Sequence, residues 1–108
     1  MEREKINNIT AYLLDHFKEP LCIEQAAQLV HLSPSAFCRY FKKITRRTFI
    51  ETVVDYRIDY AARHLRNTDM PIAHIAFDSG FADMSNFYRA FKKRKNLSPL
   101  TYRKIFLK

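Results

Sequence analysis

The residues of this sequence best suited to chemistry are two matching sets of polar and basic side chains. Each set has a serine, an arginine four residues later and a lysine three residues after that: Ser35, Arg39 and Lys42, and then Ser85, Arg89 and Lys92. At about 100° per residue, the members of a set share one face of a helix. The arginine guanidinium matches the two acceptors on the edge of guanine, and lysine neutralises phosphate. Such a face is typical of a helix that enters the major groove of DNA.

The opposite face of these two helices is aromatic. The residues that cluster away from the serine are Phe37, Tyr40, Phe41 and Ile44 in the first helix, and Phe87 and Phe91 in the second. Cys38 falls on the polar face of the first helix and Tyr88 on that of the second. Because the phenylalanines have the spacing of core residues, we interpret them as packing groups rather than base-stacking groups.

The charge of the chain indicates a polyanionic partner. Nineteen Lys and Arg against eleven Asp and Glu give a formal charge of +8 and an isoelectric point of about 9.7. The five basic residues between Glu24 and Glu51, and the eight basic residues after Asp83, lie in segments without any acidic residue. Solubility alone would be served by interspersed charges, so this segregation favours two basic binding surfaces.

The composition limits the fold. A chain of 108 residues has room for one domain or two very small ones, which excludes a large catalytic architecture. Hydrophobic residues make up 47%, enough for a packed core, whereas one Gly and four Pro leave too few turn residues for a β-rich fold. We therefore expect an all-α protein of about seven helices.

No catalytic, cofactor or metal site is indicated by the residue pattern. The sequence offers no paired carboxylates and no nucleophile with its base, and Cys22, Cys38 and the four His lack the paired spacing of zinc ligands. We expect both thiols to be free. No stretch resembles a signal peptide or a membrane span, so we expect a cytoplasmic location and no membrane contact.

Capping signals place the helices. Ser33 and Ser98 each precede a proline, and Asp83 precedes the second basic helix, whereas Cys22 stands where a stronger cap would carry Ser or Thr. The expected helices cover about 2–17, a short segment after residue 22, 34–44, 49–66, 71–79, 84–94 and a last segment from residue 99.

Apolar spacing defines the inner faces of the long helices. We expect Leu14 on the inner face of the first helix, and Ile50, Val54 and Ala61 on that of the helix 49–66. Arg57 falls on the same face. A buried guanidinium needs a partner, so we expect Arg57 to bond a carboxylate, with Asp78 as one candidate, or helix C-terminal carbonyls.

Residues 23–43 and 72–93 are two copies of one motif. The segments IEQAAQLVHLSPSAFCRYFKK and IAHIAFDSGFADMSNFYRAFKK align with one residue added in the second. Each has a short helix with an alanine for close packing, a three-residue turn and a basic helix, which is the pattern of a helix-turn-helix. His31 and Gly80 stand where the turns need positive φ, and Asn96 is suited to a left-handed position after the second copy.

These motifs resemble the AraC/XylS family of bacterial transcription regulators over nearly the whole chain. The resemblance rests on the tandem motif, the segment RIDYAARHL, the segment IAFDSGFADMSNFYRAFKK and the closing SPLTYRK. Arg46 departs from it, because members commonly have Gly after the first recognition helix. The resemblance implies a helix-turn-helix subdomain over 1–48, a linker helix over 49–66 and a second subdomain over 67–108.

The resemblance further implies a sequence-specific DNA-binding domain, with one recognition helix of each subdomain in successive major grooves of promoter DNA. Matching register assigns the base-facing positions to Ser35, Cys38 and Arg39, and to Met84, Ser85, Asn86 and Arg89. The lysines expected at phosphates are Lys42, Lys43, Lys92 and Lys93. For both arginines, a phosphate clamp without base preference is the alternative.

Two other function classes are alternatives to DNA binding. A helical module that binds an acidic protein surface, such as RNA polymerase, would use the same basic faces, and both roles are compatible. An enzyme fits worst, since no catalytic constellation is present. Family members often carry a further sensing or dimerisation domain, expected outside this chain, and activator and repressor roles both stay open.

Overall fold

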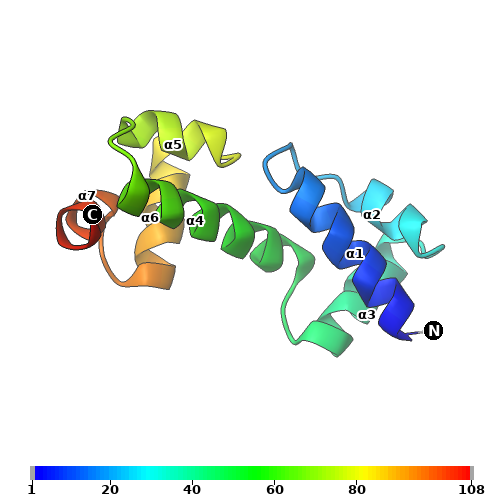
Figure 1. The fold of residues 1–108 in the computed structure, drawn as a ribbon. Helices are drawn as coiled ribbons and strands as arrows, with labels where there is room; N and C mark the ends of the chain where they lie inside the picture. Colours follow the sequence, from blue (N-terminus) through cyan, green and yellow to red (C-terminus); the bar gives the residue numbers. More distant parts are fainter. Residues whose placement is uncertain (1, 108) are drawn as a thin grey trace. The chain divides into compact units, whose positions relative to one another are not determined.

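The computed structural model describes residues 2–107, which form seven α-helices and no strand (Figure 1). The helices are α1 Glu2–His16, α2 Ile23–Leu29, α3 Pro34–Thr45, α4 Phe49–Asn67, α5 Ile72–Asp78, α6 Met84–Lys95 and α7 Pro99–Phe106. The predicted all-α fold is confirmed. The chain divides into two compact units, 1–53 and 54–108, so that α4 begins in the first and continues through the second. No helix of the described residues is long and apolar enough to span a membrane.

The predicted caps begin three of the helices. The side-chain oxygens of Ser33, Asp83 and Ser98 each accept a hydrogen bond from the backbone N–H three residues ahead, at 3.2, 2.8 and 3.2 Å. These bonds satisfy amide groups that a helix N-terminus otherwise leaves unpaired. Cys22 makes no such bond, as its residue type predicts.

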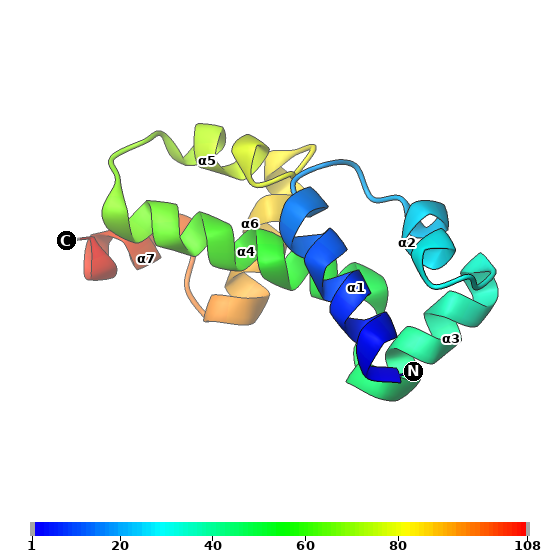
Figure 2. The same ribbon diagram turned by 45° about the vertical axis from the view of Figure 1, so that its right-hand side comes forward.

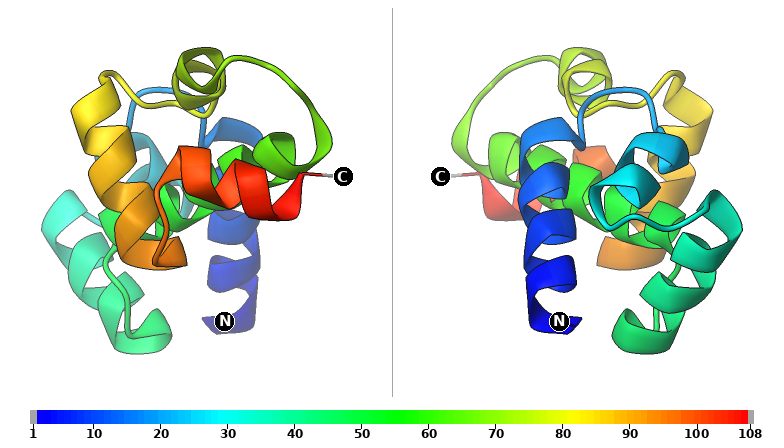
Figure 3. Two further views of the ribbon diagram at one scale, coloured as in Figure 1. Left: turned by 90° about the vertical axis from the view of Figure 1, so that its left-hand side faces the viewer. Right: turned by 90° about the vertical axis from the view of Figure 1, so that its right-hand side faces the viewer.

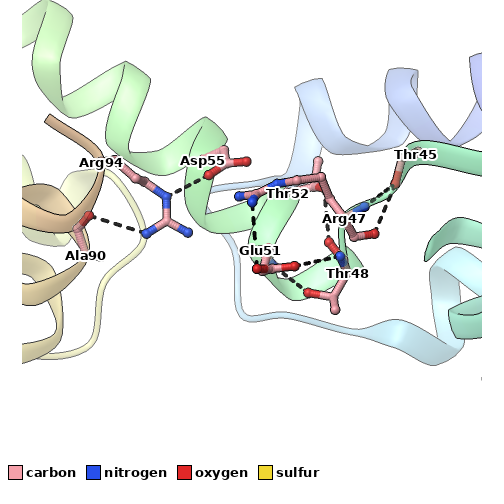
Figure 4. A network of polar contacts seen from close by, with 8 residues as sticks. All are labelled: Thr45, Arg47, Thr48, Glu51, Thr52, Asp55, Ala90 and Arg94. Carbon is pink, nitrogen blue, oxygen red and sulfur yellow. Dashed lines mark hydrogen bonds and ion pairs between the residues drawn. The ribbon is translucent and has the colours of Figure 1, made fainter.

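A further cap, at the start of α4, was missed from the sequence. The backbone N–H of Thr48 donates to the Glu51 carboxylate at 2.9 Å, and the backbone N–H of Glu51 donates to the Thr48 hydroxyl at 3.0 Å (Figure 4). This is a capping box, and its signature, Thr followed three residues later by Glu, stands in the sequence. The bond from the Thr48 amide holds the pKa of the Glu51 carboxyl below its usual value.

The turn residues adopt the predicted left-handed conformation. His31 has φ 59° and Gly80 has φ 108°, and Asn96 has φ 62°. Arg46 has φ 64° at the end of α3, the position that Asn96 takes at the end of α6. Arg46 therefore adopts the left-handed conformation that glycine would adopt at this position, and because arginine has a Cβ, this conformation is strained.

Three aromatic rings close the core of the first unit. Phe49, from the first turn of α4, meets the rings of Phe37 and Phe41 edge to face, at centroid distances of 5.2 and 5.5 Å. The other buried residues of this unit come from α1, α2, the turn that follows α2, which Figure 2 shows leading into α3, and α4: Ile9, Leu13, Ala26, Ala27, Val30 and Val53. The core therefore holds α3 by one face only.

The second unit has a larger core. Its buried residues include Ile58, Ala61, Ala62, Leu65, Ile75, Ala76, Phe81, Phe87, Phe91 and Tyr102. The Phe91 ring meets Tyr102 of α7 edge to face at 5.2 Å, and Phe87 meets Phe81 at 5.3 Å. In Figure 3, α6 and α7 lie next to one another within this unit.

Three apolar residues predicted to face inward are exposed. The prediction is wrong for Leu14, Ile44 and Ile50, which are 61%, 42% and 52% exposed. The periodicity gives the direction of the inner face of a helix, but neighbouring elements cover only part of that face. Ile50 follows the buried Phe49 by one residue, about 100° around the helix, and no neighbouring element of the first unit covers that side.

Arg103 joins α7 to the end of α4. Its guanidinium donates three hydrogen bonds to backbone carbonyls, those of Leu65 at 3.3 Å, Thr68 at 3.1 Å and Met70 at 2.6 Å. Carbonyls at a helix C-terminus lack intrahelical partners and carry partial negative charge. The guanidinium of Arg103 therefore satisfies one carbonyl in the last turn of α4 and two carbonyls of the segment that follows the helix.

Arg57 is half-buried on α4. Its guanidinium lies 5.9 Å from the centroid of the Phe81 ring, and burial lowers the pKa of the guanidinium. Asp78, the candidate partner, accepts a hydrogen bond from the Tyr60 hydroxyl. A carboxylate or carbonyl partner for Arg57 stays a prediction.

We expect Arg103→Lys to lower the free energy of unfolding by about 1–3 kcal/mol, because one ammonium cannot reproduce three divergent hydrogen bonds. Urea titration followed by circular dichroism measures this. Arg89→Lys, the same exchange at an exposed position of α6, is the control and should change stability little. Equal stabilities of the two variants would contradict the anchoring role of Arg103.

We expect Arg57→Leu to lower the melting temperature of the DNA-free protein, since the substitution removes the cation from its contact over Phe81 and from its predicted partner. Arg63→Leu is the matched control, because Arg63 lies over the Tyr60 ring at 6.0 Å on the same helix but is exposed, so its loss should lower the melting temperature less. Unchanged stability combined with weaker DNA binding would instead assign Arg57 to a phosphate contact.

Candidate nucleic-acid interface

Burial of two phenylalanines sets the rotation of α3. Phe37 and Phe41 are 0% and 3% exposed, so the opposite face of the helix points to solvent. Every residue predicted on that face is exposed: Ser35, Cys38, Arg39, Lys42 and Lys43. The structure therefore brings the predicted residues of the first copy together on one accessible surface.

The same arrangement recurs on α6, with one exception. Phe87 and Phe91 are both 0% exposed. The predicted residues on the exposed side are Ser85, Asn86, Arg89, Lys92 and Lys93. Met84 is half-buried and packs against the core of the second unit. A base contact from Met84 stays a prediction, and it would have to come from the part of its side chain left exposed.

The first recognition helix borders an open groove. The groove has a volume of about 630 Å³, and its lining includes Cys38 and Arg39 of α3 together with Phe49 and Ile50 of α4. It thus sets apolar side chains next to a guanidinium. Phe49 is buried and Ile50 is exposed, so Ile50 is the apolar side chain that this surface presents to a ligand beside Arg39.

Not all of the eight basic residues after Asp83 are available to a ligand. Arg94 pairs with Asp55 at 2.6 Å, as Figure 4 shows, and Lys95 pairs with Asp59 at 3.1 Å. Arg103 is engaged with the carbonyls of Leu65 in α4 and of Thr68 and Met70 in the segment that follows. These three cations hold the second unit together, whereas Lys92 and Lys93 are exposed. A count of charges along the sequence does not separate the two groups, because the acidic partners lie 36 and 39 residues away.

The side-chain carboxamide of Asn86, in the first turn of α6, is held by a hydrogen bond. The Asn86 side chain donates from Nδ2 to the second carboxylate oxygen of Asp83 at 3.0 Å, while the first oxygen caps the helix. Arg89 lies one turn further along and is exposed. An amide and a guanidinium at this spacing offer hydrogen bonds to two neighbouring bases.

The site contains groups for binding and shows no assembly for metal chemistry. Within residues 2–107, no three His, Cys, Asp or Glu side chains gather in a way that could hold a metal ion. Cys38 is an exposed free thiol on the basic face of α3. The donors of this surface, from guanidinium, ammonium, hydroxyl and amide groups, are those found at DNA phosphates and base edges.

Comparison with known proteins gives a consistent result. The family profile described as a helix-turn-helix domain matches residues 26–105. The chain is 31% identical over 104 residues to the regulatory protein SoxS of Escherichia coli, covering 95% of this chain and 97% of SoxS. It is 33% identical over 104 residues to the bifunctional transcriptional activator/DNA repair enzyme AdaA of Bacillus subtilis, covering 96% of this chain and 49% of AdaA.

A solved structure shares both sequence and fold. The C-terminal domain of AraT, a response regulator from Geobacillus stearothermophilus, is 30% identical with a TM-score of 0.88, over 96% of this chain and 87% of that one. The chain spans about a third to a half of the length of several curated relatives. Tandem recognition helices, the profile match and these similarities agree, and the chain belongs to the AraC/XylS family of helix-turn-helix transcription regulators, of which it carries the DNA-binding domain.

Proposed function

We propose that this domain binds promoter DNA sequence-specifically, with α3 and α6 in successive major grooves. One observation carries the proposal: two helices, each capped by a side chain and anchored by a buried phenylalanine pair, present the same exposed arginine and lysine pattern. A duplicated basic face at constant register is what two successive grooves of one duplex require.

The proposed roles follow from the donors of each side chain. Arg39 and Arg89 each donate a bidentate pair to a guanine, and Asn86 pairs with an adenine. The remaining base-facing positions are Ser35, Cys38, Met84 and Ser85. Serine hydroxyls are compatible with several bases, so Ser35 and Ser85 contribute less discrimination than the arginines.

The lysines of both helices supply affinity without sequence preference. Lys42, Lys43, Lys92 and Lys93 lie in the last turns of α3 and α6, after the base-facing residues. Each phosphate they neutralise releases counterions, so binding weakens linearly in log salt concentration. We propose double-stranded DNA as the partner on this basis, and the cytoplasm as the compartment where that partner is found.

A protein partner is a second candidate role, favoured by one feature of α7. Four large apolar side chains in α7 and directly after it are 44–60% exposed: Leu100, Ile105, Phe106 and Leu107. Several large exposed apolar side chains on one short segment mark a candidate contact surface. RNA polymerase, or a sensing or dimerisation domain outside this chain, would fit such a surface without competing with α6 for DNA. We propose no enzymatic role for these residues.

A DNA footprint tests two-groove binding directly, because each subdomain should protect its own groove. If 1–48 and 67–108 each place one helix in a groove and 49–66 links them, the groove contacts lie about 34 Å apart on one face of the duplex. We expect hydroxyl-radical protection over about two helical turns on a selected DNA site. Protection confined to one groove would contradict the two-groove proposal.

The base role of Arg89 is separable from the phosphate role of Lys93. We expect Arg89→Ala to weaken binding to the selected site by about 1–3 kcal/mol and to relax preference at one base pair, whereas Lys93→Ala weakens all duplexes evenly. Titration of specific and random duplexes at fixed salt measures both. Equal losses on the two duplexes for Arg89→Ala would make Arg89 a phosphate clamp.

A further inference from the structure

The two recognition helices begin differently. In α3 the capping residue is Ser33, and the residue three positions ahead is Ala36, which has no polar side chain. In α6 the corresponding pair is Asp83 and Asn86. Only the second pair combines a cap with two acceptor oxygens and a side chain that can donate to the second of them.

Both oxygens of the Asp83 carboxylate are engaged by Asn86. One accepts the backbone N–H at 2.8 Å, and the other accepts a proton from the side-chain Nδ2 at 3.0 Å. An ionised carboxylate only accepts hydrogen bonds, so the nitrogen end of the carboxamide has to face it. The contact therefore fixes which way the amide group of Asn86 is turned.

The remaining groups of the amide match one base. With one N–H held by Asp83, the Asn86 side chain keeps a second N–H and its carbonyl oxygen. Adenine presents N7, an acceptor, and the N6 amino group, a donor, so both groups are satisfied. An amide free to turn over could instead direct its carbonyl to cytosine or its nitrogen to guanine or thymine.

We propose that Asp83 is a specificity-determining residue, which holds the Asn86 carboxamide in the orientation that selects adenine. Asp83 is a positioning residue, since it acts through Asn86 rather than on the base. Both side chains are exposed, so the pair is accessible to DNA without rearrangement of the core. The inference rests on the proposed DNA-binding function and adds to it a source of discrimination that α3 lacks.

The variant Asp83→Ser tests the proposal without removing the cap. Serine caps helices about as well as aspartate and already does so in α3, so the melting temperature should stay close to that of the unsubstituted protein. Only the acceptor for Nδ2 is lost. Asp69→Ser, at an exposed position of the same unit, removes one negative charge as well and serves as the charge-matched control.

The measurement is base preference at a single position. A site is selected from random duplexes, and four duplexes that differ only at the base pair read by Asn86 are titrated at one salt concentration. We expect the preference for adenine to fall roughly threefold to tenfold in Asp83→Ser, the range of one hydrogen bond, and to persist in Asp69→Ser. In an Asn86→Ala background, Asp83→Ser should change the preference no further.

Three results would overturn the proposal while leaving DNA binding intact. These are an unchanged adenine preference in Asp83→Ser, an equal effect of that substitution in the Asn86→Ala background, and an adenine preference that survives Asn86→Ala alone. If the unsubstituted protein prefers no duplex over another at any position, sequence-specific binding itself fails, and the role of Asp83 fails with it.

Discussion

The interface depends on how phenylalanine burial fixes the rotation of each recognition helix. Phe37 and Phe87 are completely buried, and each has a second phenylalanine four residues later on the same face. At 100° per residue, this burial leaves Arg39 and Arg89 no option but the solvent face. Exchanging the apolar pair for polar residues would remove the preference for that rotation. The core therefore determines which side chains a ligand meets, although no core residue contacts it.

The basic residues after Asp83 have two different roles, since some are paired within the protein and others are exposed. Arg94, Lys95 and Arg103 hold α6 and α7 against α4 through carboxylates and carbonyls, whereas Lys92 and Lys93 are exposed. Exposed ion pairs contribute little individually, and Lys95–Asp59 is of this kind, whereas Arg94–Asp55 is partly shielded and joins segments far apart in the sequence. Structure and affinity thus draw on the same basic segment, and the +8 charge overstates the number of cations available for phosphate.

What could be predicted from the sequence was mostly local. The caps at Ser33 and Asp83 and the left-handed turns at His31 and Gly80 follow from the residue itself and its nearest neighbours, and all four were predicted. The role of Arg103 could not be, because its three carbonyl acceptors lie more than thirty residues earlier. The predicted burial of three apolar residues was wrong for a related reason. Periodicity gives the direction of the inner face of a helix, but it does not give how wide a face the neighbouring helices cover.

The duplication also distributes backbone strain unevenly. In the first unit the two left-handed positions belong to His31 and Arg46, and in the second they belong to Gly80 and Asn96. Glycine adopts this conformation freely and asparagine more readily than arginine, so the cost of roughly 1 kcal/mol per residue is concentrated at the ends of α2 and α3. A ligand that binds the folded unit favours that conformation by mass action. The first unit therefore carries more of this backbone strain than the second, and DNA bound through α3 offsets part of the cost to the extent that it binds only the folded unit.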